Sequence, residues 1–255
     1  MDAIAPIAPA ALVLFGLVIG SFLNVVISRV PAGQSLWGPR SACPTCGAAI
    51  AWHDNIPVLS FVALRRRCRG CAGPISWRYP IVETVTALLF LLAYFRFGLG
   101  AELAVAALLL ALLVAVTGID IDHQIIPDVI TLPGIVAGAL ANLSLPGHSF
   151  VDSLIGIGLG GGIFFAIILL SGGGMGGGDM KLGATLGAFL GWRLTLVALF
   201  LAVVVGGVAA VAVLAAGRKG RKDPIPFGPF LAFGGVVALF WGTRLVRWYL
   251  DAFTG

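Results

Sequence analysis

The chain has 255 residues, of which 59% are hydrophobic and only 11% are charged, and its mean hydropathy is +1.05. Soluble domains carry about 25% charged residues, so this composition excludes an ordinary soluble protein and indicates an integral membrane protein. The formal net charge of +5 fits contact with anionic lipid headgroups better than nucleic-acid binding, because no basic soluble face with stacking aromatic residues accompanies it.

Long apolar runs without strict two-residue alternation favour transmembrane helices over barrel strands. We expect an all-α polytopic membrane protein with about eight transmembrane helices, near residues 9–30, 80–98, 101–119, 125–145, 150–171, 181–192, 194–216 and 229–249. The sixth run is too short to cross about 30 Å of hydrocarbon as a straight helix, so it is tilted, extended by its neighbours or re-entrant. We expect three parts: a first transmembrane helix at 1–30, a cytoplasmic lobe at 31–79 and a transmembrane core at 80–255.

Basic residues orient these spans. Residues 29–79 hold seven arginines against one acid, Asp54, and the loop 217–223 holds four basic residues, Arg218, Lys219, Arg221 and Lys222. The positive-inside rule puts both segments in the cytoplasm. If each of the eight spans crosses the membrane once, residues 120–124 and 172–180 also lie on the cytoplasmic side. Four arginines land outside and weaken the asymmetry slightly: Arg96, Arg193, Arg244 and Arg247.

The first two spans carry polar residues. Ser21 and Asn24 lie in GSFLNVVISRVP, residues 20–31, where they either support interhelical hydrogen bonding with close packing at Gly20 or line a substrate groove. Glu83 is an acid in the second span, and such residues are functional by default. An ion pair between Glu83 and Arg78 explains it almost as well.

Four cysteines mark the lobe at 31–79, which we call the cysteine lobe. They form two C-x2-C pairs 21 residues apart: Cys43, Cys46, Cys68 and Cys71. In a reducing cytoplasm this pattern predicts a structural four-thiolate Zn²⁺ site. The metal would stabilise a segment that is too short to build much of a hydrophobic core. Two disulfides and an iron–sulfur cluster are the less favoured alternatives.

Two polar interruptions carry the acids of greatest interest. Asp120 lies in TGIDIDHQIIPD, residues 117–128, and Asp179 lies in GGGMGGGDMKL, residues 172–182. The two apolar runs between them cross the membrane out and back, so both acids should lie at the same surface. Two carboxyl groups there could share a proton and activate a water molecule. The sequence therefore indicates a membrane-embedded aspartyl protease.

Neighbouring residues of the first interruption have simpler interpretations. Asp120 and Asp122 stand two apart and point in different directions on a helix, so only one can readily meet a given partner. Pro127 opens a turn before the fourth span, Asp128 is predicted to be its N-cap, and His123 is predicted to be solvated.

The glycine-rich segments do not predict a nucleotide site. GIGLGGG, residues 156–162, matches G-x-G-x-x-G but lies in an apolar helix rather than after a strand. The pairs Gly156/Gly160 and Gly158/Gly162 instead predict close helix contact. In the 172–178 run, Asp179 takes the position of the lysine that a P-loop needs.

Glycines without Cβ, among them Gly176 and Gly178, would let backbone and substrate approach a carboxylate closely. Lys181 either pairs with an acid or reaches lipid headgroups. PIPFGPFL, residues 224–231, is a stiff turn into the last span on the same predicted face.

These motifs together resemble the bacterial prepilin peptidases, also called type IV leader peptidases. The resemblance rests on GSFLNVVISRVP, the double C-x2-C, IDIDHQIIPD, GMGGGDMKLGA and PFGPFL in this order, and it covers almost the whole chain. It implies a GxGD-type aspartyl protease whose catalytic residues are Asp120, not Asp122, and Asp179. Arg65-Arg66-Arg67-Cys68 departs from the family, which often has a glycine between two arginines.

The resemblance also implies substrates and location. Members of the family lie in the bacterial inner membrane and cut the basic leader of prepilins and pseudopilins after a glycine on the cytoplasmic side. Many then methylate the new N-terminus with S-adenosylmethionine, although no motif locates that site here. The expected partners are the prepilin and pseudopilin substrates and membrane lipid, and nucleic acid is not expected to bind.

Two other functions compete with this one. A GxGD protease for another substrate, such as signal-peptide remnants, is disfavoured by the cysteine lobe. A transporter or channel could use Asp120, Asp179 and Glu83 as a cation path, but its acids should lie near the midplane and its halves often repeat.

Overall fold

A computed structural model describes residues 7–145, 149–171, 175–217 and 225–254. The first three glycines of the 172–178 run lie outside the described residues. The basic residues of the 217–223 loop also lie outside them: Arg218, Lys219, Arg221 and Lys222.

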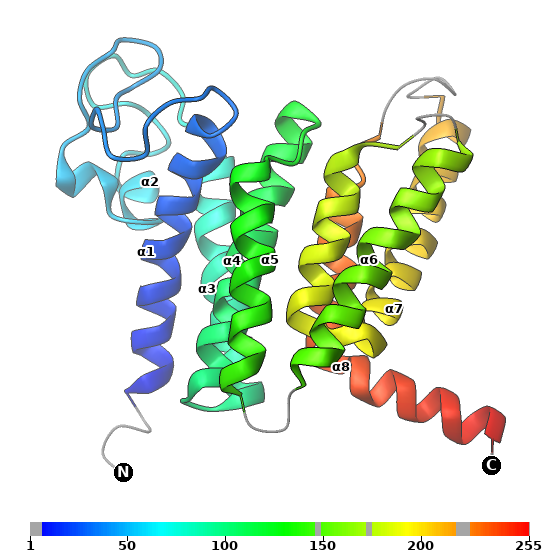
Figure 1. Ribbon diagram of the computed structural model, residues 1–255. Helices are drawn as coiled ribbons and strands as arrows, with labels where there is room; N and C mark the ends of the chain where they lie inside the picture. Colours follow the sequence, from blue (N-terminus) through cyan, green and yellow to red (C-terminus); the bar gives the residue numbers. More distant parts are fainter. Residues whose placement is uncertain (1–6, 146–148, 172–174, 218–224, 255) are drawn as a thin grey trace. The chain divides into compact units, whose positions relative to one another are not determined.

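The described residues form helices and no regular strand, apart from two isolated β-bridges. The elements are α1 (Ala8–Arg29), η1 (Trp52–Asn55), α2 (Leu59–Ala63), α3 (Arg78–Phe97), α4 (Ala101–His123), α5 (Asp128–Ser144), α6 (Phe150–Leu170), α7 (Gly177–Ala215) and α8 (Gly228–Thr254) (Figure 1). The all-helical prediction is confirmed, and each of the eight predicted spans overlaps one of these helices.

The sixth and seventh predicted spans are the two arms of α7. Gly191 interrupts this helix of 39 residues with a φ of 69° and a ψ of 170°. The first arm packs antiparallel to α6, and the second packs antiparallel to α8, where Ala198 lies against Gly234 and Leu194 against Gly242. The chain therefore reverses direction at Gly191, and the short sixth run gains an extra turn at its N-terminal end.

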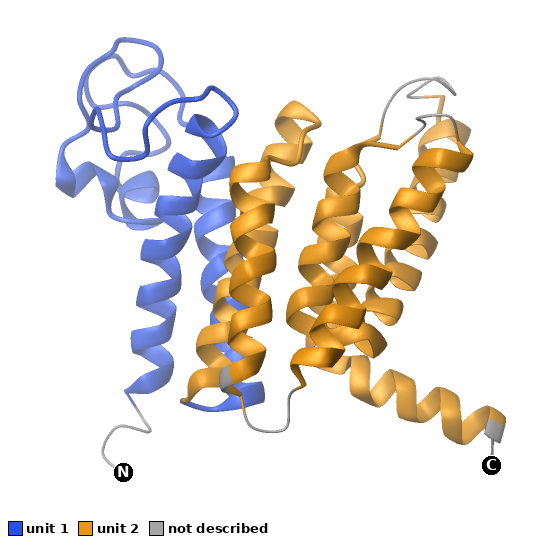
Figure 2. Cartoon of the chain, viewed as in Figure 1, with its two compact units in different colours: residues 1–99 blue, residues 100–255 orange. Residues whose placement is uncertain are grey.

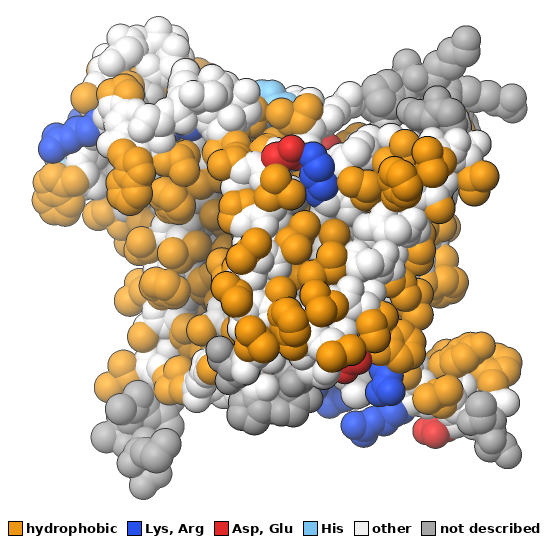
Figure 3. Space-filling model, viewed as in Figure 1, with side chains coloured by type: hydrophobic (Ala, Val, Ile, Leu, Met, Phe, Trp, Pro, Cys, Tyr) orange, Lys and Arg blue, Asp and Glu red, His pale blue; other side chains and the backbone are white. Residues whose placement is uncertain are grey.

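Apolar side chains cover the outside of the helices rather than only their contacts. Six helices of the described chain are long and apolar enough to cross a membrane, and α5 is a shorter apolar helix. Large hydrophobic residues stay exposed along them, for example Leu14, Leu88, Val136 and Phe200 (Figure 3). Exposed apolar area of this extent indicates contact with lipid, so the protein is a multi-pass membrane protein.

The chain divides into two compact units, residues 1–99 and 100–255 (Figure 2). In the first unit α1 and α3 cross closely, because the backbone of Ala87 meets Gly16 and that of Glu83 meets Gly20. One turn further along α1, buried Asn24 donates from Nδ2 to the carbonyl of Tyr79 at 3.1 Å. Gly20 and Asn24 thus take part in close packing and interhelical hydrogen bonding.

Glycines also set the contact between α6 and α7 in the second unit. Gly156 and Gly160 of α6 lie against the backbone of Gly187 and Gly183 of α7, with no room for a Cβ at either crossing point. Gly158 and Gly162 have open space where a Cβ would be, so the prediction of close contact was right for the first pair and wrong for the second.

Candidate active site

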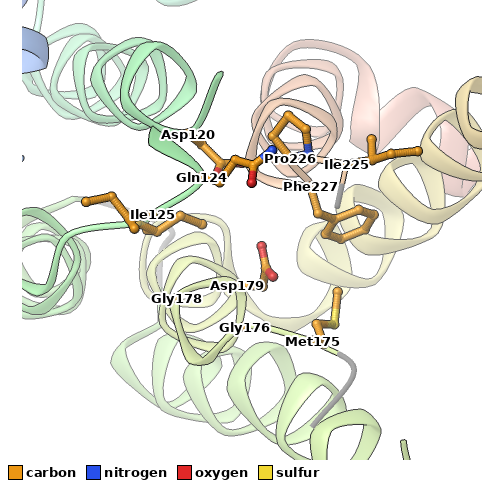
Figure 4. A pocket seen from close by; sticks show the side chains of 11 residues that line it. Asp120, Gln124, Ile125, Met175, Gly176, Gly178, Asp179, Ile225, Pro226 and Phe227 are labelled. Atoms are coloured by element: carbon orange, nitrogen blue, oxygen red, sulfur yellow. The ribbon is translucent and has the colours of Figure 1, made fainter. Parts of the chain in front are cut away.

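One cavity of about 620 Å³ lies in the second unit, among helix ends and the segments that join them (Figure 4). The last turn of α4, the start of α7 and the segment that leads into α8 surround it, and the loop before α5 completes the wall. Its lining residues are Asp120, Gln124, Ile125, Ile126, Met175, Gly176, Gly178, Asp179, Ile225, Pro226 and Phe227. Both aspartates singled out in the sequence therefore line the same cavity.

Asp120 is buried, and a backbone N–H group binds its carboxyl group. Its side chain is buried, with 5% of its surface exposed. The backbone N–H of Gly228 donates to Oδ2 of Asp120 at 2.8 Å. Gly228 is the first residue of α8, and N–H groups at a helix start have no partner within the helix, so they are free to bind a carboxylate. A Cβ on Gly228 would lie 2.7 Å from the same oxygen, so any other residue at this position would displace the carboxyl group or the start of α8.

Asp179 comes from the first turn of α7 and points into the cavity, toward the side formed by Asp120 and Gln124 (Figure 4). Gly176 is the N-cap of α7, and its carbonyl accepts from the N–H of Asp179 at 3.1 Å. Gly178 lies against Ile126, where a Cβ would come within 2.8 Å of the isoleucine Cβ. The first turn of α7 therefore touches the loop that follows Asp120.

Lys181 pairs with an acid, one of its two predicted roles. Its Nζ lies 2.6 Å from Oδ1 and 2.7 Å from Oδ2 of Asp128. Asp128 was expected to be an N-cap. It is instead the first residue of α5 after the cap residue Pro127, and no capping hydrogen bond from a side chain forms there. The carboxylate is instead turned toward Lys181.

Other predicted residues lie away from the cavity. Asp122 and His123 are exposed at the end of α4 and are not among its lining residues. Glu83 belongs to the first unit, where its Oε2 accepts from the backbone N–H of Val58 at 2.8 Å. The buried carboxylate thus anchors the start of α2 to α3, and Val58 holds an unusual positive φ of 60° there.

The cysteine lobe folds into two similar knuckles. The N–H of Cys43 donates to the carbonyl of Ala48 at 2.9 Å, and that of Cys68 donates to Gly73 at 2.8 Å. The four thiol sulfurs all lie within 4.8 Å of one another, and those of Cys43 and Cys71 are 3.9 Å apart. Four sulfurs bound about 2.3 Å from one zinc ion stand about 3.8 Å apart, so the cluster fits Zn²⁺.

Local electrostatics favour the thiolate at Cys43 but not at Cys71: the backbone N–H of Gly73 lowers the pKa of Cys71, yet the neighbouring cysteine thiols and burial raise it to about 11 overall. Hydrogen bonds from the backbone N–H groups of Cys46 and then Thr45 lower the pKa of Cys43 to about 6, which favours the thiolate that a metal binds. Beside the knuckles, Arg69 donates to both carboxylate oxygens of Asp54 at 2.7 and 2.8 Å. The hydrogen bond from Arg69 lowers the pKa of Asp54. This pair ties the second knuckle to η1.

Sequence reasoning missed Gly228 and Phe227 as parts of the site. PIPFGPFL was expected to be a turn on the active face, yet Gly228 binds Asp120 and Phe227 lines the cavity. A glycine followed by a proline at a helix start was the available signal. It marks a backbone position but does not reveal which side chain the free N–H will meet.

Comparisons with known proteins cover both units. A model of the bacterial peptidase A24 N-terminal domain matches residues 14–97, and a model of the type IV leader peptidase family matches residues 107–211. No solved structure matched the chain.

Curated relatives from several bacteria carry the description prepilin leader peptidase/N-methyltransferase. That of Aeromonas hydrophila is 41% identical over 94% of this chain and 93% of its own length. That of Myxococcus xanthus is 46% identical over 85% of this chain and 67% of its own length. That of Bacillus subtilis is 36% identical over 96% of this chain and 98% of its own length.

Proposed function

We propose that this chain, which belongs to the type IV leader peptidase family, is a prepilin leader peptidase that cleaves by a two-aspartate mechanism. The observation that carries the proposal is the shared cavity of Asp120 and Asp179, which reach it from the end of α4 and the start of α7. The substrates would be prepilins and pseudopilins, cut after the glycine that ends a basic leader.

The proposed catalytic residues are Asp120 and Asp179. Two carboxyl groups that face one small cavity hold a single proton more readily than two negative charges. The ionised carboxylate accepts a proton from water as the water oxygen attacks the scissile carbonyl carbon. The protonated carboxyl donates a hydrogen bond to the carbonyl oxygen. When the C–N bond breaks, the pair returns a proton to the leaving amine, and the carboxylate product departs.

The remaining lining residues would bind the chain on either side of that bond. Most of them are apolar: Ile125, Ile126, Met175, Ile225, Pro226 and Phe227. Such a wall suits an apolar side chain beside the scissile bond and keeps bulk water from the reacting atoms. Gly176, Gly178 and Lys181 support the cavity from α7, and Glu83 supports the first unit.

Two cofactors belong to the proposal. Cys43, Cys46, Cys68 and Cys71 would hold one structural Zn²⁺, whose four protein ligands leave no open position for chemistry. The relatives' description as N-methyltransferases suggests that this chain also methylates the new terminal amine, and S-adenosylmethionine would supply the methyl group. We assign no residues to that second activity.

The proposed location is the bacterial inner membrane, with the active cavity facing the cytoplasm and lipid around the helices. The excess of arginine in residues 29–79 supports this orientation. The test is to incubate the purified full-length protein with a prepilin and to follow loss of the leader by mass spectrometry. Loss of mass equal to the leader, ending at its glycine, would support the function, and an intact prepilin would refute it.

A further inference from the structure

We propose that Lys181 and Asp128 are a positioning pair for catalysis: their ion pair fixes the rotation of the first turn of α7 and so directs Asp179 into the cavity. The inference rests on the proposed peptidase function and assigns a role to two residues that do not line the cavity. It follows from three features of this end of the second unit.

The start of α7 has little of its own to set its rotation. Gly176 caps the helix, and Gly177 and Gly178 are its first two residues. Glycine has no side chain to pack and has a low helix propensity, so this turn depends on contacts made by later residues. Gly177 has open space around it, and Gly178 contacts Ile126 only through its backbone.

Lys181 and Asp179 leave the helix on different sides. Successive residues turn by about 100° around an α-helix, so side chains two apart diverge by about 200°. While Asp179 points into the cavity, Lys181 reaches the other way, to both oxygens of Asp128 at 2.6 and 2.7 Å. Turning α7 so that Asp179 left the cavity would therefore break both contacts of Lys181.

Asp128 is itself attached to the opposite wall. It begins α5 directly after the loop whose Ile125 and Ile126 line the cavity, and that loop follows the turn of Asp120. Further along, the hydroxyl of Thr185, which donates to the carbonyl of Lys181 at 2.9 Å, also lies 3.3 Å from the carbonyl of Thr131. Lys181 lies one turn before Thr185, so the ion pair extends this row of contacts between α5 and α7 to the turn that carries Asp179.

The exposure of the Lys181–Asp128 pair favours a positioning role over a stabilising one. The side chains of Lys181 and Asp128 are 29% and 56% exposed. Ion pairs as exposed as this contribute little to the free energy of unfolding. Misplacing a catalytic group by about 1 Å, in contrast, can lower a rate by about 100-fold. Breaking the pair should therefore lower kcat much more than it lowers the melting temperature.

The experiment compares the full-length wild-type protein with Asp128→Lys, Lys181→Asp and the exchanged double variant, using prepilin cleavage in one assay. We expect each single variant to lose roughly 10- to 100-fold in kcat with a KM close to that of the wild type. The double variant should recover most of the loss, because it restores an ion pair between the same positions. Asp122→Lys makes the same charge reversal at an exposed position that does not line the cavity, and is the matched control.

Each outcome decides a separate point. If the wild type does not cleave prepilin, the proposed function fails. If it cleaves and both single variants keep its kcat, the peptidase stands and the positioning pair is refuted. A double variant that regains the wild-type melting temperature but stays as slow as the single variants also refutes it, because the pair would then serve stability alone. Should a single variant not fold, Lys181→Gln and Asp128→Asn replace it under the same criteria.

Discussion

The backbone N–H of Gly228 donates to Oδ2 of Asp120 at 2.8 Å and joins two positions that lie 108 residues apart in the chain. One is the last turn of α4, and the other is the first residue of α8. The contact orients a buried carboxyl group with a backbone donor whose position the helix start fixes. Asp120 therefore presents a defined face to the cavity that it shares with Asp179.

Gly228→Ala should lower the rate of prepilin cleavage by at least about tenfold, equivalent to about 1.4 kcal/mol in the barrier. The added Cβ would lie 2.7 Å from Oδ2 of Asp120, so the carboxyl group or the start of α8 must move. Gly207→Ala is the control, because nothing lies within 4 Å of that position. Equal rates in the two variants would show that the contact with Gly228 does not position Asp120.

Two adjacent glycines in the first turn of α7 should respond differently to alanine. Gly178→Ala should lower cleavage, because its Cβ would meet that of Ile126 at 2.8 Å and push apart the two sides of the cavity. Gly177→Ala should keep the rate and raise stability by up to about 1 kcal/mol, because its surroundings are open and alanine favours the helix. Rates and melting temperatures measured side by side test both statements, and a slow Gly177→Ala would contradict them.

Much of the fold could be predicted because bilayer-spanning helices need long apolar runs, which composition reveals directly. The reversal at Gly191 could not, because φ and ψ of a glycine leave no mark in the hydropathy pattern. Similarly, Gly156/Gly160 and Gly158/Gly162 have the same spacing, yet only the first pair meets α7. The two pairs lie on different faces of α6, and spacing alone does not tell which face a neighbour covers.

The site, like the fold, could be predicted from the sequence only in part. Asp120 and Asp179 could be paired in advance, because an even number of crossings returns the chain to one surface. The partners of Asp120 and Asp128 could not, since they depend on how helix ends pack. Asp128 was predicted to be a cap, yet it binds Lys181, 53 residues along the chain.

The cysteine lobe should contain one zinc ion per chain, and Cys46→Ser should release it. We expect that variant to give less purified protein and a lower melting temperature, because metal binding and folding of such a lobe are coupled. The cleavage rate of correctly folded molecules should fall less. Metal analysis of the folded wild type is the direct measurement, and protein without zinc or iron would exclude the site.

Arg66 offers a test of backbone strain in the same lobe. Its φ of 63° is unfavourable for a residue with a Cβ, and its guanidinium lies 5.7 Å from the ring centroid of Trp77. Arg66→Gly should relieve about 1 kcal/mol of strain and lose about 0.5–1 kcal/mol of cation–π attraction, leaving stability nearly unchanged. Arg66→Ala keeps the strain and loses the attraction, so it should melt at a lower temperature. A glycine variant that melts below the alanine variant would contradict this explanation.

The most direct test of the two-aspartate mechanism is the cleavage rate of Asp179→Asn, measured on protein whose yield and melting temperature match the wild type. Asp120→Asn and the double variant complete the comparison, with Asp122→Asn as the exposed control. We expect each single variant to abolish nearly all cleavage, the double variant to be scarcely slower than either, and Asp122→Asn to keep most activity, because the pair acts as one unit. Rapid cleavage of prepilin by well-folded Asp179→Asn would contradict the mechanism.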